Sequence, residues 1–185
     1  MRIFVAGGAG FIGSHLCDEL LARGHEVTCV DDLSAGRLEN LNRSMSHDGF
    51  RFVEMDVTRD PSLSEVGRDH EVVINLVAKK IPRYSSALST LETNVQATHT
   101  TIELARANRA KYVLASTSDV YGKGAKLPFA EDDDLLIGSS TSRRWSYAAS
   151  KLYDEHLCFA YQDEYDLDVV MLRFFGAYGE RQYLN

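Results

Sequence analysis

A tyrosine and a lysine lie four residues apart in the stretch R-R-W-S-Y-A-A-S-K, residues 143–151. Residues at i and i+4 share a helix face, so Tyr147 and Lys151 would project together. A free phenol has a pKa of about 10 and is a poor base at neutral pH. A neighbouring ammonium favours the phenolate and lowers this pKa, which suits general-base catalysis. The pair therefore indicates proton abstraction by Tyr147 or, because such spacings also occur by chance, one face of an ordinary helix.

Hydroxyl and acidic side chains at 116–119 (S-T-S-D) are candidate partners for this tyrosine. They follow an apolar run at 111–115 that is typical of a buried strand. A hydroxyl at such a strand end can hydrogen-bond a substrate alcohol and the tyrosine that takes its proton. Ser, Thr and Asp also bond local backbone in turns, which is the alternative interpretation. The functional interpretation is favoured if Tyr147 and Lys151 face the cluster.

Apolar runs alternate with helical periodicity along the whole chain. This alternation predicts the α/β class, a Rossmann-like doubly wound parallel sheet with helices on both faces. Such a sheet binds ligands at the carboxyl ends of its strands, where the strand order reverses. The expected strands are 2–6, 26–30, 51–55, 71–77, 111–115 and 168–174, and the main expected helices are 11–23, 88–108 and 145–165.

Glycines follow the first expected strand in G-G-A-G-F-I-G, residues 7–13. The run fits two dinucleotide-binding registers, one starting at Gly7 and one at Gly8. Glycines there allow a tight turn, close approach of a pyrophosphate and close packing of helix on strand. The helix N-terminus would point its free N–H groups at that pyrophosphate, whereas the alternative is a turn without a ligand. The expected cofactor contacts are Gly7, Gly10, Phe11, Ile12 and Gly13.

Acids at the next two strand ends predict how the rest of the cofactor is held. Asp31, 18 residues after Gly13, can accept hydrogen bonds from ribose hydroxyls and would repel a 2′-phosphate. NAD is therefore expected over NADP, although Arg37 is placed where it could receive such a phosphate. Asp56, followed by Val57, could accept a hydrogen bond from the adenine amine or cap a turn in D-V-T-R-D.

Composition limits the remaining possibilities. The 185 residues suffice for one well-packed domain, and 44% of them are hydrophobic, as in ordinary globular proteins. A formal charge of −7 argues against nucleic acid or an anionic membrane as a partner. Three dispersed cysteines predict reduced thiols and a cytoplasmic location. No metal site is expected, and the acidic run 131–134 is interpreted as a solvated loop.

With these residues in hand, the chain resembles the extended short-chain dehydrogenase/reductase family, in its NAD-dependent epimerase/dehydratase branch acting on nucleotide sugars. The resemblance covers all 185 residues. Its markers are G-G-A-G-F-I-G-S-H-L, D-D-L-S-A-G, D-V at 56–57, T-N-V, S-T-S-D-V-Y-G, Y-A-A-S-K and L-R-F-F-G-A-Y-G.

The resemblance assigns roles to individual residues. It implies that Thr117 is the catalytic hydroxyl, Tyr147 the base and Lys151 its partner, and the lysine can also hold the nicotinamide ribose. It further implies that Asn94 supports the active site and that Lys80 reaches the cofactor, as a lysine does in some sugar epimerases.

The implied reaction begins with oxidation at C4 of a nucleotide sugar by tightly bound NAD. A 4-epimerase acting on a UDP-hexose or UDP-hexuronate is the leading expectation. A UDP-glucuronate decarboxylase, a sugar 4,6-dehydratase and a non-catalytic dinucleotide-binding protein are the alternatives. Dehydratases carry an acid where this chain has Ser118, so elimination is less expected. Decarboxylases usually have T-S-E, and Asp119 is one methylene shorter, which leaves decarboxylation open.

The substrate contacts are expected to be Ser118, Asp119 and Arg144. Arg144 is placed to contact a diphosphate or a uronate carboxylate, and an exposed loop charge is the alternative. Gly176 stands where many members have an asparagine that contacts the substrate diphosphate.

Relatives of this kind usually continue well past the length of this chain. Residues 1–185 are therefore expected to form the NAD-binding Rossmann domain, with the substrate-binding part after them. Members commonly dimerise through the long helix and the tyrosine-bearing helix. A homodimer is thus expected, with Leu91, Val95 and Ile102 partly at the interface.

Overall fold

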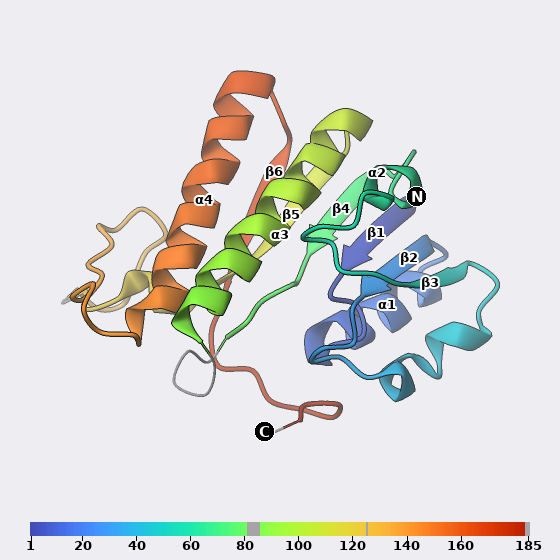
Figure 1. The fold of residues 1–185 in the computed structure, drawn as a ribbon, viewed down its shortest axis with the longest axis horizontal. Coiled ribbons are helices and arrows are strands. Elements are labelled where there is room, and N and C mark those ends of the chain that lie inside the picture. Colours follow the sequence, from blue (N-terminus) through green and yellow to red (C-terminus); the bar gives the residue numbers. More distant parts are fainter. Residues whose placement is uncertain (81–85, 125, 184–185) are drawn as a thin grey trace.

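The computed structural model describes residues 1–80, 86–124 and 126–183, and it confirms the predicted doubly wound fold (Figure 1). One parallel six-stranded sheet has the order β3-β2-β1-β4-β5-β6. The order reverses between β1 and β4, which is where such sheets bind ligands. The strands are β1 (Arg2–Ala6), β2 (Glu26–Asp31), β3 (Phe50–Glu54), β4 (Val72–Asn75), β5 (Lys111–Thr117) and β6 (Val169–Phe174).

Helices cover both faces of this sheet. Figure 1 shows the two long helices α3 and α4 lying side by side over one face, while α1 packs against the other. The helices are α1 (Phe11–Ala22), α2 (Leu63–Val66), α3 (Ala87–Asn108) and α4 (Trp145–Tyr165), with 3-10 turns η1 (Leu38–Leu41), η2 (Ser44–Ser46) and η3 (Ser118–Tyr121).

Two hydrophobic cores lie on opposite sides of the sheet because successive strand residues point to opposite faces. On β1, Val5 packs in the core beneath α1, whereas Phe4 packs in the core beneath α3 and α4. Ile102 is fully buried in this second core. The expectation that Ile102 lies at a subunit interface is therefore wrong, because the chain buries that side chain against its own sheet.

Two strands end two residues away from the expected position, and both differences affect the candidate site. β4 stops at Asn75, whose Oδ1 accepts the backbone N–H of Val77 at 3.0 Å. This side-chain bond replaces a ladder bond and turns the chain away from the sheet. β5 runs two residues further than expected, because Thr117 pairs with Phe174 of β6. Thr117 is thus the last residue of a strand, held from one side by the sheet.

Candidate active site

The glycine loop after β1 forms a cradle that side chains could not occupy. Gly7 has φ of 78°, a left-handed conformation that favours glycine. A Cβ on Gly13 would lie 2.3 Å from the carbonyl oxygen of Gly7, so α1 approaches the loop as closely as backbone allows. Gly10 is the N-cap residue of α1. A Cβ on Gly8 would lie 2.4 Å from Cys29 Sγ, so both registers have a steric reason at their first position and share Gly13 as their last.

The N-terminus of α1 is open for an anion. Its cap residue has no side chain, no cap hydrogen bond forms, and the first turn carries no acid. The first N–H groups of such a helix need external partners and favour negative charge. Phe11 and Ile12, half-buried, begin this helix beside the loop. The cradle and the open helix end therefore fit a dinucleotide pyrophosphate.

Asp31 lies at the carboxyl end of β2, beside the glycine loop. Its Oδ2 accepts the backbone N–H of Ala9 and its Oδ1 accepts that of Leu33, each at 2.9 Å. Burial raises the pKa of Asp31, and the two N–H donors oppose that rise in part. Each carboxylate oxygen keeps a further lone pair, so the side chain is oriented by the backbone and can still accept from a ribose hydroxyl.

Arg37, the residue that could instead receive a 2′-phosphate, is engaged by the end of the described chain. Its guanidinium lies 3.5 Å above the centre of the Tyr183 ring, and its backbone N–H bonds the carbonyl of Ala9. The Tyr183 hydroxyl in turn donates to Asn40 at 3.2 Å. The guanidinium is therefore stacked on an aromatic face.

Asp56, Val57 and Lys80, which were also expected near the cofactor, differ in their surroundings. Asp56 accepts both the backbone N–H and the hydroxyl of Thr58, and it pairs with Arg59 at 2.8 Å. These bonds, together with the arginine, hold the pKa of Asp56 below its usual value despite the opposing effect of burial. The Val57 side chain is buried in the core, and Lys80 is exposed. Asp56 thus forms the turn that the sequence offered as its alternative role, and one lone pair of Oδ2 is left for another donor.

Thr117 and Tyr147 meet at the carboxyl end of β5. The Thr117 hydroxyl oxygen accepts the backbone N–H of Asp119 at 3.2 Å, which leaves its own proton to donate. Burial raises the pKa of Tyr147 to about 12, a hydrogen bond with Thr117 opposes that rise, and the negative charges of Asp119 and Asp154 add to it. The structure therefore brings the predicted hydroxyl and phenol together, although the phenol is held neutral.

Lys151 pairs with an acid on its own helix. Its ammonium forms an ion pair with Asp154 Oδ2 at 3.3 Å, and both side chains are almost completely buried. Within the part of the chain that the structure describes, the ammonium makes no hydrogen bond. That Lys151 and a bound NAD⁺ together lower the pKa of Tyr147 stays a prediction.

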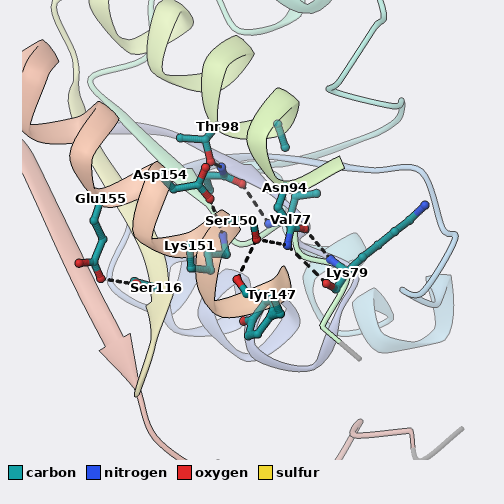
Figure 2. A network of polar contacts seen from close by, with 12 residues as sticks. Val77, Lys79, Asn94, Thr98, Ser116, Tyr147, Ser150, Lys151, Asp154 and Glu155 are labelled. Carbon is teal, nitrogen blue, oxygen red and sulfur yellow. Dashed lines mark hydrogen bonds and ion pairs between the residues drawn. The ribbon is translucent and has the colours of Figure 1, made fainter. Parts of the chain in front are cut away.

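Asn94 of α3 fixes the first turn of α4 to the loop after β4. Its Oδ1 accepts the backbone N–H of Lys79 at 2.8 Å, and its Nδ2 donates to Ser150 Oγ at 3.0 Å. Ser150 Oγ then donates to the carbonyl of Tyr147 at 2.8 Å. Figure 2 follows these contacts from Lys79 through Asn94 and Ser150 to Tyr147. Asn94 therefore helps to fix the position of Tyr147, through the backbone N–H of Lys79 and the backbone carbonyl of Tyr147.

A second support, which sequence reasoning missed, is Glu155. Ser116 donates to Glu155 Oε1, and Arg173 pairs with Oε2 at 2.8 Å in a largely buried site. Arg173 also donates to the carbonyl of Glu131 at 3.0 Å. These bonds join α4 to the ends of β5 and β6. The sequence gives one signal of this contact. Glu155 lies on the same helix face as Lys151, and a charged side chain is rarely buried without a partner.

The expected substrate residues lie just after β5 and at the start of α4. Ser118 and Asp119 begin η3 directly after Thr117, and Asp119 is exposed. Arg144 is the exposed N-cap residue of α4, and its guanidinium lies 5.0 Å from the Trp145 ring centre. Among the residues that the structure describes, no cluster of potential metal ligands occurs and no helix is both long and apolar enough to cross a membrane.

The sheet order and the glycine cradle define a dinucleotide-binding α/β protein, and comparison with known proteins specifies the family. The sequence profile of the NAD dependent epimerase/dehydratase family matches residues 3–185. The chain therefore belongs to the NAD-dependent epimerase/dehydratase family, as its motifs predicted. The predicted cofactor, NAD, agrees with this membership.

Individual relatives differ in their reactions. UDP-N-acetyl-alpha-D-glucosaminuronate decarboxylase of Bacillus cytotoxicus is 37% identical over 182 residues, which are 97% of this chain and 56% of the relative. The structure of UDP-N-acetylglucosamine 4-epimerase from Methanobrevibacter ruminantium M1 has a TM-score of 0.88 at 31% identity, covering 98% of this chain and 57% of that one. UDP-glucuronic acid 4-epimerase from Bacillus cereus, solved with NAD, has a TM-score of 0.85 at 32% identity, covering 98% and 59%. The chain thus spans a little over half the length of these proteins.

The cradle yields a direct test by substitution. Gly13→Ala places a Cβ against the Gly7 carbonyl and forces α1 away from the loop, so the affinity for NAD should fall by about tenfold or more. Isothermal titration calorimetry would measure it. Gly176→Ala is the matched control, because a Cβ there meets nothing within 4 Å and should leave the affinity unchanged. Equal affinity for both variants would contradict the assigned cradle.

Proposed function

We propose that this chain is the NAD-binding part of a nucleotide-sugar 4-epimerase whose substrate is a UDP-hexose or UDP-hexuronate. The observation that carries the proposal is that Thr117 and Tyr147 meet at the carboxyl end of β5, with Lys151 one turn further along the helix that carries Tyr147. A protein that only bound a dinucleotide would need the cradle but not this group. Relatives that include UDP-sugar epimerases support the same conclusion.

The chemistry proposed for these residues is proton transfer at the sugar's C4 hydroxyl. NAD⁺, when bound, supplies the acceptor for the C4 hydride. Tyr147 takes the hydroxyl proton as a phenolate, and Thr117 orients the same hydroxyl by a hydrogen bond. Because burial raises the pKa of Tyr147 to about 12, nearby positive charge must lower it before the phenol can act as a base. After the 4-keto sugar turns over, Tyr147 returns the proton as hydride comes back to the other face.

Decarboxylation of a UDP-hexuronate is the second candidate. Oxidation at C4 makes a hexuronate a β-keto acid, which can lose its carboxyl group as CO₂. The same first step by Tyr147 thus serves both reactions. The decarboxylase of Bacillus cytotoxicus, 37% identical, and the sequence Thr117-Ser118-Asp119 favour this candidate. In either case Asp119 and Arg144 are proposed to contact the substrate, together with a part of the protein beyond this chain.

Products distinguish the two reactions. The full-length protein, incubated with NAD⁺ and UDP-glucuronate and followed by NMR, is expected to form UDP-galacturonate. A UDP-pentose or 4-ketopentose would instead establish the decarboxylase. No product from any UDP-sugar would contradict both and favour a dinucleotide-binding protein without catalysis.

Tyr147→Phe is the control that ties the products to the assigned base. Removing the phenol oxygen should reduce turnover by about 10²- to 10⁴-fold, the usual contribution of general acid–base catalysis. NAD affinity should stay close to that of the unaltered protein, because the aromatic ring still fills its buried site. Turnover that is unaffected would refute the role of Tyr147.

A homodimer through α3 and α4 is part of the proposal. Leu88 and Leu91 of α3 and Tyr153 of α4 are 63%, 37% and 45% exposed, and Tyr153 bonds His99 across the helix pair. Unlike the core residue Ile102, these side chains remain available to a second copy. Apolar and aromatic side chains on one exposed face are typical of such interfaces.

Sedimentation velocity tests this association. The protein is expected to sediment as a dimer, and Leu91→Glu should shift it toward the monomer by placing like charges across the interface. Leu38→Glu, at a similarly exposed leucine in η1 on the other side of the sheet, should leave the dimer intact. A monomeric wild-type protein, or equal effects of the two variants, would contradict the proposed interface.

A further inference from the structure

Asp154 and Lys151 form a buried ion pair inside α4 that the assigned roles do not explain. The exposed fractions of their side chains are 0% and 1%, and Lys151 Nζ lies 3.3 Å from Asp154 Oδ2. In the described part of the chain neither the ammonium nor either carboxylate oxygen makes a hydrogen bond. Buried charges are usually both paired and hydrogen-bonded, so this pair is incompletely satisfied.

The surroundings of Asp154 leave Lys151 as its one close cation. Polar groups approach from each element packed against it, and Figure 2 shows Thr98 of α3 beside the carboxylate. Of these groups only Lys151 and His99 carry or can gain positive charge, and His99 is half-exposed and bonded to Tyr153. The titratable groups that interact with Asp154 are His99 of α3, Tyr112 of β5, and Tyr147, Lys151 and Cys158 of α4.

The ion pair decides where the charge of Lys151 acts. Lys151 stands one helical turn from both Tyr147 and Asp154, and an ammonium has three N–H donors. In the structure the ammonium pairs with the acid, and none of its donors bonds the phenol. The acid also acts on the phenol directly, because its negative charge disfavours the phenolate.

We propose that Asp154 is a positioning residue of the candidate active site, which draws the Lys151 ammonium along α4 and so limits how strongly that charge promotes ionisation of Tyr147. The role in catalysis rests on the proposed function, whereas the effect on Tyr147 ionisation does not. The unused donors of Lys151 are then available to a ribose hydroxyl and to the phenolate, while Asp154 keeps the ammonium in place. The acid thus keeps the phenol protonated until a ligand brings in further positive charge.

Ionisation of Tyr147 can be measured without turnover. The protein is labelled with ¹³C at the tyrosine ζ carbon, saturated with NAD⁺ and titrated with pH by NMR, and the resonance is assigned by its loss in Tyr147→Phe. Asp154→Asn removes the negative charge while keeping the side chain's size. The titration midpoint of Tyr147 should fall by about one pH unit in this variant.

A matched control separates this effect from a general change of charge. Asp163→Asn makes the same change at an exposed position of α4 and should leave the midpoint unchanged. Asp154→Ser introduces a smaller side chain that can still accept one hydrogen bond from Lys151, and it should lower the midpoint of Tyr147 as well. If one of the two Asp154 variants does not fold, the other still tests the proposal. An unchanged or raised midpoint in the folded variant would overturn the proposal.

The same variants distinguish this inference from the proposed function. In the full-length enzyme the acidic limb of the kcat profile should move to lower pH in Asp154→Asn by the shift seen in the titration. A shifted titration without sugar turnover in any variant would refute the proposed function but not the role of Asp154. Turnover with an unshifted titration would refute the role of Asp154 alone.

Discussion

The buried contact of Glu155 with Ser116 and Arg173 holds the candidate site together. Tyr147 lies on α4 and Thr117 on β5, so their meeting depends on how firmly the helix is fixed to the strand ends. Glu155 accepts from Ser116, the residue before Thr117, and pairs with Arg173 of β6. Removing one partner of such a buried pair typically costs about 3–5 kcal/mol, because the other charge is left uncompensated.

Consecutive acids on α4 therefore perform different tasks. Glu155 is fully satisfied by an arginine and a hydroxyl, and it fixes the position of the helix. Asp154 pairs with Lys151 and has no hydrogen bond within the described residues. Its negative charge raises the pKa of Tyr147. Asn94 completes the support by joining Ser150 to the loop after β4. Tyr147 is thus placed by neutral and ionic contacts that leave its hydroxyl free to bond Thr117.

Local patterns were sufficient to predict most of the fold and part of the site. The glycine loop is marked by four glycines within seven residues, and the Tyr147–Lys151 pair by helix periodicity, so both were visible in the sequence. The cofactor preference assigned to Asp31 followed from its place at a strand end. The short elements α2, η1, η2 and η3 were missed because they hold too few residues to show a period.

Contacts between distant segments were beyond the reach of local patterns. Arg173 is close to Glu155 only because β6 pairs with β5, and the burial of Ile102 depends on which face of α3 meets the sheet. The burial of Tyr147, which raises its pKa, was also not visible in the sequence. The sequence places Asp154 one turn from Lys151 but does not reveal that both are buried.

The central claim is that the open end of α1 and the group around Tyr147 serve one bound NAD. A crystal structure of this chain with NAD⁺ tests it most directly. The account predicts the pyrophosphate on the N–H groups of Gly10 to Gly13, the adenosine ribose on Asp31, and the nicotinamide ribose within hydrogen-bond distance of Lys151 and Tyr147. A cofactor bound elsewhere, or one whose nicotinamide points away from Thr117 and Tyr147, would contradict it.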